Sequence, residues 1–242
     1  LTCFVASLVQ NLPTMIKLSE TARAFISPSD LTFSWDGCHR CLWLTYNFQV
    51  KAPLTMPLVG DLAEMQELSC LNKTSAELHP DIPEGKAVQH GGWVKSKPIV
   101  VDGDETPFFI NGKYDLLMEF TDGTNGIIDC KFQSNDSDKS KFYFVQLEAY
   151  AFALEHPQSG DPVSISNMGL LVWSPVKIRG VSAGNFGMEL ACSWFEVKRD
   201  PKALQERLTE FIKMVTGDIP PAKPKCDQCN YVANREGIIN SL

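Results

Sequence analysis

The stretch that decides the fold is Gly112-Lys113-Tyr114-Asp115-Leu116-Leu117-Met118-Glu119-Phe120, followed after a turn by Gly126-Ile127-Ile128-Asp129-Cys130-Lys131-Phe132. Both runs are rich in apolar and aromatic residues, and the Asp- and Gly-containing turn between them predicts an antiparallel hairpin. Side chains alternate between the faces of a strand, so Asp129 and Lys131 share one face. The hairpin can bring Asp115 beside them. Two carboxylates and an amine on one surface suit a hard divalent cation and an anionic ligand.

The chain is acidic and long enough for one substantial domain. It has 242 residues, a formal net charge of -7 and a pI of about 5.1. This composition excludes a strongly basic nucleic-acid-binding protein, so any contact with nucleic acid is expected to be local and metal-assisted. No run approaches the roughly 20 apolar residues that a membrane span needs, and no membrane partner is expected.

Hydrophobic periodicity predicts an α/β fold with a central mixed sheet flanked by helices. Residues 1–28 are expected to be a leader segment, disordered or not native, and residues 29–242 to form a single domain. Helices are predicted over residues 31–48, 58–71, 142–155 and 201–215, and strands over residues 93–101, 108–120, 126–132, 168–173 and 192–197.

Half of the eight cysteines occur as two pairs, Cys38/Cys41 and Cys226/Cys229. A Cys-x-x-Cys loop places two thiolates on one ion, so two such loops predict a site with four sulfur ligands. Their wide separation predicts a clamp that ties the C-terminal part of the chain to the N-terminal helices. A disulfide framework is not expected without a secretory signal, which favours a reduced, cytoplasmic location. The isolated cysteines are expected to be core residues, namely Cys3, Cys70, Cys130 and Cys192.

Three segments together resemble a known family. They are Gly112-Lys113-Tyr114-Asp115, Asp129-Cys130-Lys131 and Gln146-Leu147-Glu148-Ala149-Tyr150, in that order. On a strand–strand–helix pattern they resemble the PD-(D/E)XK nuclease superfamily, and most of all its RecB-like exonuclease branch, which includes CRISPR-adaptation nucleases. The resemblance covers about residues 29–231 and implies a three-layer, restriction-endonuclease-like core.

The resemblance also implies roles for individual residues. Asp115 and Asp129 would ligate Mg²⁺ or Mn²⁺, and the carbonyl of Cys130 would complete part of the metal shell. Lys131 would orient or deprotonate the attacking water and steady charge on the phosphate. The remaining pair, Gln146 and Tyr150, lie four residues apart on one helical face and would reach the metal site or the nucleic-acid backbone.

The family also carries an acidic or histidine ligand on an upstream helix. Its histidine form, Gly-x-x-x-His, is absent, but Gly60 is followed four residues later by Glu64. We therefore expect Glu64 to be the third acid, with Asp61 as the second choice. This departure leaves the number of bound metal ions open, because two-metal chemistry needs more carboxylates.

Several RecB-like nucleases hold an iron–sulfur cluster with cysteines that flank the core, and the layout of the two pairs looks like theirs. The usual pattern is one upstream and three downstream cysteines, whereas this chain has two and two. The resemblance therefore favours a [4Fe–4S] cluster on Cys38, Cys41, Cys226 and Cys229, with Zn²⁺ as the alternative.

The resulting hypothesis is a metal-dependent deoxyribonuclease, an exonuclease that acts on single-stranded DNA or DNA ends in repair, recombination or CRISPR adaptation, with protein partners in such a complex. The alternative is a non-catalytic nucleic-acid-binding or assembly subunit that retains the nuclease fold. Phosphate contacts are expected from Lys95, Lys97, Lys113, Lys139 and Lys141, although lysines on a surface are often merely solvated. For Phe142, Tyr143 and Phe144, core packing is expected over base stacking.

Overall fold

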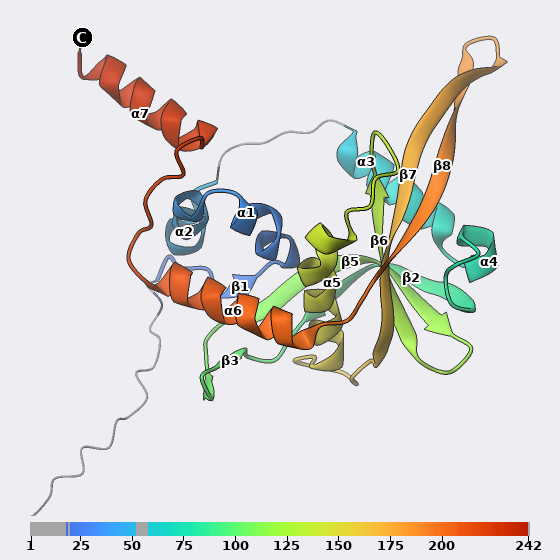
Figure 1. Ribbon diagram of the computed structural model, residues 1–242, viewed down its shortest axis with the longest axis horizontal. Coiled ribbons are helices and arrows are strands. Elements are labelled where there is room, and N and C mark those ends of the chain that lie inside the picture. Colours follow the sequence, from blue (N-terminus) through green and yellow to red (C-terminus); the bar gives the residue numbers. More distant parts are fainter. Residues whose placement is uncertain (1–17, 19, 52–57, 242) are drawn as a thin grey trace, which may run out of the picture.

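The molecule is built around one twisted mixed sheet with helices on both faces (Figure 1). The computed structural model describes residue 18, residues 20–51 and residues 58–241. The prediction of an α/β fold with a mixed sheet flanked by helices is confirmed. The strands of the sheet are β1 (Phe25–Ile26), β2 (Gly85–Lys95), β5 (Phe109–Phe120), β6 (Asn125–Phe132), β7 (Ile165–Ser182) and β8 (Asn185–Val197).

Strand β5 is central to the sheet, because it pairs with β1, β2 and β6. The predicted hairpin is present: β5 and β6 pair antiparallel, and Gly123 takes a positive φ of 83° in the turn between them. Strand β6 then pairs in parallel with β7, and β7 pairs antiparallel with β8. A separate small ribbon joins β3 (Val100–Val101) to β4 (Asp104–Glu105).

Alternation along β6 divides the core between the two faces of the sheet. Ile127 belongs to the larger apolar cluster, which packs under α5 (Ser140–Glu155) and α6 (Pro201–Thr216). The next residue, Ile128, belongs to a smaller cluster that includes Cys70 at the end of α3 (Val59–Cys70). The sheet is therefore covered by α5 on one face and by α3 on the other, and a side chain of β6 meets one helix or the other according to its position.

The N-terminal helical region is broken where one helix was predicted. Residues 31–48 divide at Gly37 into α1 (Phe33–Asp36) and α2 (His39–Phe48), after a short 3₁₀ helix, η1 (Pro28–Leu31). Ordered structure also begins before the expected boundary at residue 29, because β1 pairs with β5 and Arg23 is buried. Most of the expected leader, residues 1–17 and 19, lies outside the described residues.

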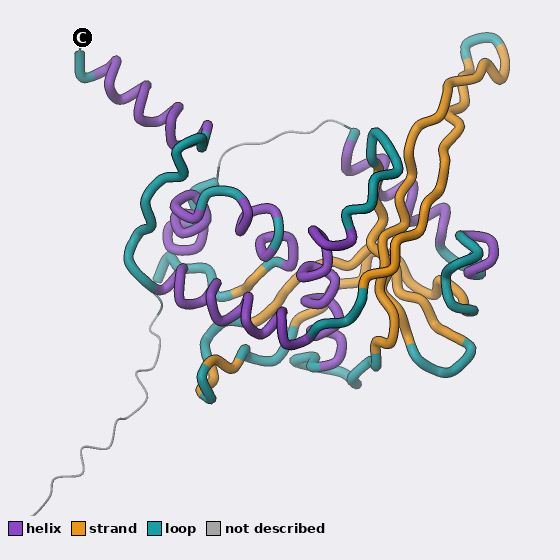
Figure 2. Tube along the Cα trace, viewed as in Figure 1, coloured by secondary structure: helices purple, strands orange, loops and turns teal. Residues whose placement is uncertain are grey.

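Two projections leave the body of the molecule (Figure 2). The antiparallel pair β7–β8 runs well beyond the sheet and turns at Gly184, so the predicted strands at residues 168–173 and 192–197 are each much longer than expected. At the other side, helix α7 (Asp227–Ile239) has no buried residue. Short α4 (Ser75–Leu78) lies near β2, and β2 itself starts at Gly85, earlier than the strand predicted from Trp93. No helix in the described ranges has the length and apolar character to cross a bilayer.

A buried ion-pair network fixes α5 against the sheet. The guanidinium of Arg199 lies 2.8 Å from Glu148 Oε1 and 2.8 Å from Glu155 Oε2, and it also donates to the carbonyl of Ile165. Glu148 is only 1% exposed, so its carboxylate depends on Arg199 and on the backbone N–H of Asp200 for compensation. The network joins α5, the start of β7 and the segment that leads into α6.

Replacing Arg199 with alanine should destabilise the fold, because it leaves the buried charge of Glu148 without its ion-pair partner. We expect the free energy of unfolding to fall by about 3 kcal/mol in urea denaturation. The control is Lys202→Ala, which removes an exposed i,i+4 pair with Glu206 and should change stability by less than about 0.5 kcal/mol. Equal stability of the two variants would contradict the role assigned to Arg199.

Candidate active site and metal centre

The candidate active site lies where strands β5 and β6 part. Their last ladder pair on this side is Leu116 with Ile128, so Asp115 and Asp129 occupy the first position at which the strands are no longer paired. The carboxylate of Asp115 fills the gap: its Oδ2 accepts a hydrogen bond of 2.7 Å from the backbone N–H of Cys130. The predicted meeting of these two acids is therefore produced by the end of a backbone ladder.

Lys131 bridges the two acids. Its Nζ lies 2.5 Å from Asp129 Oδ2 and 3.9 Å from Asp115 Oδ2. It also donates to the carbonyl of Cys130 at 3.3 Å. This carbonyl, which was predicted to be a backbone ligand of the metal, therefore lies beside the same ammonium group as the two carboxylates. Burial lowers the pKa of Lys131, but the charges of Asp129 and Asp115 outweigh burial and raise it, so the side chain is an ammonium at neutral pH.

The charge of Asp129 opposes the ionisation of Asp115. Burial and the negative charge of Asp129 raise the pKa of Asp115 to about 7, although Lys131 and the Cys130 N–H act in the opposite direction. Asp129 itself is 2% exposed. A site that crowds carboxylates in a buried place gains stability from any added positive charge, and carboxylate and carbonyl oxygens are ligands that Mg²⁺ and Mn²⁺ accept.

Helix α5 supplies the two polar residues predicted from the Gln-x-x-x-Tyr spacing. Gln146 donates from Nε2 to Asp129 Oδ1 at 3.0 Å, and its Oε1 accepts from the hydroxyl of Thr32 at 3.4 Å. Tyr150, one turn later, donates to the carbonyl of Lys113 at 2.8 Å. The helix forms because the segment has no Gly or Pro and is rich in Ala, Leu and aromatic residues. Gln146 thus fixes the orientation of the Asp129 carboxylate.

The acid that helix α3 brings to the site is Glu67, whereas the predicted Glu64 and Asp61 are exposed. Glu67 is 5% exposed, and its Oε2 lies 3.6 Å from His90 Nδ1 and 3.8 Å from Lys113 Nζ. Both contacts are longer than hydrogen bonds, so this buried oxygen accepts none. A buried carboxylate oxygen without a hydrogen bond is costly unless a cation compensates it, and here the half-exposed ammonium of Lys113 is the cation within ion-pair distance.

The hydroxyl of Tyr150 lies in the field of all three acids. Burial and, in order, the charges of Asp129, Asp115 and Glu67 all raise the pKa of its hydroxyl. Sequence patterns could not identify Glu67, because α3 carries an acid at every third position of its first three turns and the choice among them depends on how the helix is rotated against the sheet. The buried neighbour Gln66, which donates to the carbonyl of Leu171, fixes that rotation.

The lysines expected to contact phosphate have different surroundings. Lys95 lies over the ring of Phe109 at 4.2 Å, and Lys113 faces Glu67. Lys97, Lys139 and Lys141 are exposed. Among the aromatic residues at the start of α5, Tyr143 is a core residue, as expected, and its ring lies 5.0 Å from Lys131 Nζ. Phe142 and Phe144 are half-buried against the same core.

The four paired cysteines meet in one place, as their spacing predicted. Within the described ranges, they are the one group of metal-ligating side chains whose donor atoms all lie within 4.8 Å of one another. Cys41 Sγ lies 3.5 Å from Cys229 Sγ and 3.6 Å from Cys226 Sγ, and Cys38 Sγ lies 3.9 Å from Cys229 Sγ. The site can therefore bind a metal ion or an iron–sulfur cluster, and it ties α7 to α2.

Both pairs stand at the start of a helix. Cys38 and Cys226 are the N-caps of α2 and α7, and Cys41 and Cys229 are the third residues of the same helices. A helix N-terminus favours negative charge, so two of them support thiolates. Burial raises the pKa of Cys38, but hydrogen bonds from the backbone N–H groups of Lys223 and Cys41 outweigh it and lower that pKa to about 6. Cys38 is thus ready to act as a thiolate ligand at neutral pH.

Comparison with known proteins gives no family. No family model matches the chain, and no curated protein does. Among the solved structures that match is that of SSO0001, with 16% sequence identity and a TM-score of 0.49 over 82% of this chain and 79% of the other. A likeness at this level says nothing about activity.

Asp115→Asn tests the crowding of the acids. Because the pKa of Asp115 is about 7 in the folded chain and about 4 when unfolded, the folded state holds its proton more tightly. The resulting stability is complete below about pH 4 and is lost as the pH rises through about 7. Without added divalent cations, the advantage of the asparagine variant in unfolding free energy should grow by about 2–3 kcal/mol between pH 5 and pH 8. An exposed control, Asp161→Asn, should show no such trend, and an identical trend in both would contradict the prediction.

Cys226→Ser tests the clamp. Loss of one of four thiolates should weaken metal binding at the cluster and lower both the folded yield and the thermal midpoint, because metal affinity contributes directly to folding. The measurements are metal content by mass spectrometry and thermal unfolding by circular dichroism. Cys192 is exposed, contrary to the expectation that it is a core residue, whereas Cys70 and Cys130 are buried as expected. Because Cys192 lies outside the cluster, Cys192→Ser should keep the metal content and the thermal midpoint. A Cys226→Ser protein with unchanged metal content and stability would show that these thiols hold nothing.

Proposed function

We propose that the chain is a metal-dependent nuclease that hydrolyses DNA phosphodiester bonds, in keeping with its resemblance to the PD-(D/E)XK superfamily. The observation that carries the proposal is the position of Asp115 and Asp129 at the parting of two strands, with the Lys131 ammonium bridging them. Helix α3, on the other face of the sheet, contributes the further acid Glu67, which is buried as Asp129 is, whereas Asp115 is half-buried. An ion pair that is exposed, or that only stabilises the fold, does not require carboxylates to be held this close together.

The divalent cation is expected to be Mg²⁺ or Mn²⁺. Asp115, Asp129 and the carbonyl of Cys130 would hold it, and Glu67 is proposed as the third acid in place of Glu64. Their oxygens have the donor chemistry that hard cations prefer, and the buried Oε2 of Glu67 lacks a hydrogen bond. When bound, such an ion lowers the pKa of water and neutralises charge that develops on a phosphate.

The residues of the chain have the remaining tasks. Gln146 holds one oxygen of Asp129 by a hydrogen bond, which fixes the carboxylate. Lys131 is an ammonium, so it suits the binding of a phosphate oxygen or the orientation of a water molecule. The Tyr150 hydroxyl donates to the backbone of β5 and so holds α5 against the strand that carries Asp115.

The four cysteines are proposed to hold a structural centre. The resemblance favours a [4Fe–4S] cluster, whereas the sulfur spacing of 3.5–3.9 Å favours a single ion such as Zn²⁺. Four thiolates at about 2.3 Å from one zinc ion stand about 3.8 Å apart. A four-iron cluster places iron and sulfide atoms between the thiolates and requires them to move apart. A brown solution with broad visible absorption identifies iron–sulfur, and a colourless one that releases zinc identifies the single ion.

A second candidate is an assembly subunit with the same fold. It is favoured by the projecting β7–β8 pair, where Ile178, Phe186 and Met188 are 69%, 75% and 52% exposed. Ile178 pairs with Met188 in the ladder, so these side chains share a face. An exposed apolar face on a projecting arm is typical of protein–protein contact. The two candidates are compatible, and the cleavage assay decides whether catalysis is present.

The assay measures cleavage of labelled single- and double-stranded DNA in the presence of Mn²⁺. We expect cleavage by the wild type and a loss of about 100-fold or more in Lys131→Ala, since the ammonium stabilises charge on the phosphate. Glu67→Gln should lose activity to a similar degree, whereas Glu64→Gln, on the exposed side of the same helix, should keep it. Equal cleavage by Lys131→Ala and wild type would indicate a contaminant, and no cleavage by folded, metal-loaded wild type would leave the assembly role.

A further inference from the structure

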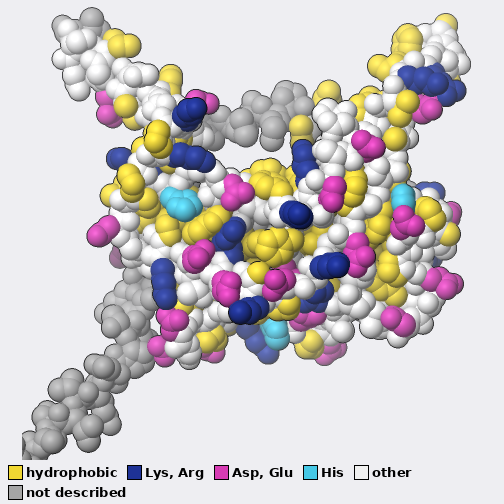
Figure 3. Space-filling model, viewed as in Figure 1, with side chains coloured by type: hydrophobic (Ala, Val, Ile, Leu, Met, Phe, Trp, Pro, Cys, Tyr) yellow, Lys and Arg dark blue, Asp and Glu magenta, His cyan; other side chains and the backbone are white. Residues whose placement is uncertain are grey.

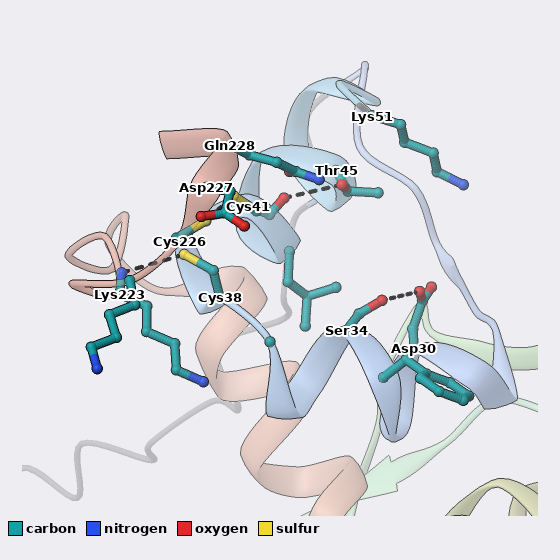
Figure 4. A pocket seen from close by; sticks show the side chains of 14 residues that line it. Asp30, Ser34, Cys38, Cys41, Thr45, Lys51, Lys223, Cys226, Asp227 and Gln228 are labelled. Atoms are coloured by element: carbon teal, nitrogen blue, oxygen red, sulfur yellow. Dashed lines mark hydrogen bonds between the residues drawn. The ribbon is translucent and has the colours of Figure 1, made fainter. Parts of the chain in front are cut away.

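A solvent-open cavity of about 550 Å³ lies beside the cysteine cluster (Figure 4). Its walls come from α1, α2 and the segment that leads into α7, and Phe33, Cys38 and Cys226 are among its lining residues. The cysteine centre therefore forms one side of the cavity. Its volume is within the range of sites that take one small ligand, about 300–1,000 Å³, so it can take about one or two nucleotides but not a duplex.

The cavity is locally basic although the whole chain is acidic. Lys51 lies on one side of it and Lys223 on the other. Lys225, two residues after Lys223 in the chain, also lines the cavity. The acid at its floor, Asp30, is already paired with Arg23 and accepts hydrogen bonds from the hydroxyls of Tyr46 and Ser34. Asp227 is the other acid on the wall. The lining therefore includes three lysines and one carboxylate without an ion-pair partner, although the Lys223 ammonium donates to the carbonyl of Asp36. This excess of positive charge favours a polyanion.

An aromatic bridge connects this cavity to the candidate active site. Phe33 lines the cavity and is 53% exposed, and its ring centroid lies 4.9 Å from that of Phe142 and 5.5 Å from that of Tyr143. Tyr143 in turn lies 5.0 Å from Lys131 Nζ. On the face drawn in Figure 3, apolar side chains gather over the region where α1 and α5 meet, with both basic and acidic side chains around them. An exposed ring between ammonium groups and reacting groups is a stacking platform.

We propose that the cavity and Phe33 form a binding path for single-stranded nucleic acid that leads to Lys131, an inference that rests on the proposed nuclease function. The lysines at the cavity contact backbone phosphates, and Phe33 stacks on an unpaired base. A base within a duplex is covered on both sides, so Phe33 discriminates in favour of single strands. The substrate class that this path implies for the nuclease is a strand whose end or loop is unpaired.

Binding of labelled oligonucleotides, measured by fluorescence anisotropy without added divalent cations, tests the path. Phe33→Ala should weaken binding of single-stranded DNA by about 5- to 100-fold, the effect of one stacked base, and leave duplex binding unchanged. Lys225→Glu should weaken binding and flatten its salt dependence. The matched controls are Phe186→Ala, at an exposed ring on the β7–β8 arm, and Lys202→Glu, at an exposed lysine of α6, and neither should change binding.

Hydrolysis of a small p-nitrophenyl phosphodiester separates this proposal from the proposed function, because that substrate reaches Lys131 without the path. The wild type should hydrolyse it with Mn²⁺ present, and the controls Phe186→Ala and Lys202→Glu, which lie outside the path, should do so at the same rate. Single-strand binding that is unchanged in both Phe33→Ala and Lys225→Glu, or that falls equally for duplex, overturns the path even if the enzyme is active. Variant-sensitive binding without any hydrolysis by wild type overturns the nuclease instead. A matched RNA strand that binds while DNA does not would overturn DNA as the ligand.

Discussion

The structure of the candidate site depends on the point where strands β5 and β6 stop pairing. Past Leu116 and Ile128 the backbone N–H of Cys130 has no partner in the ladder, and the carboxylate of Asp115 accepts its hydrogen bond instead. Because the carboxylate of Asp115 takes the place of a ladder carbonyl, it lies at the end of the β5–β6 ladder, next to Asp129. Lys131 then compensates both acids from the next position of the same face of β6. A backbone requirement, the need to satisfy a buried N–H, thus assembles a charged site inside an apolar sheet.

Much of this site could be predicted because its signals are local. Alternation along a strand places Asp129 and Lys131 together, the turn between β5 and β6 brings Asp115 to them, and a four-residue spacing places Gln146 and Tyr150 on one side of α5. The cysteine pairs are equally local, since each begins a helix and presents its thiols at the same two positions. Only the placement of these segments next to one another depends on the rest of the fold.

The parts that the sequence could not predict depend on contacts between distant segments. Glu67 is distinguished from Glu64 by the rotation of α3, which Gln66 fixes through a carbonyl of β7. The outer part of the β7–β8 arm does alternate apolar and charged residues, since Val176 and Ile178 alternate with Lys177 and Arg179, but these apolar side chains are exposed and belong to no core. The strand signal was therefore present in the sequence there. Helix α7, in contrast, has no apolar stripe, because it is held at its first turn by the cysteines and not by packing along its length.

The cysteine clamp also positions one side of the basic cavity. The backbone N–H of Lys223 lies 3.4 Å from Cys38 Sγ, and its ammonium donates to the carbonyl of Asp36, so the segment that carries two of the three cavity lysines is positioned by the sulfur centre. A bound metal therefore orders the lysine side of the cavity as well as the end of the chain. An acidic protein can hold a polyanion in this way, because a few lysines fixed at the right place act over distances comparable to the screening length, about 8–10 Å, while the acids elsewhere on the surface are screened.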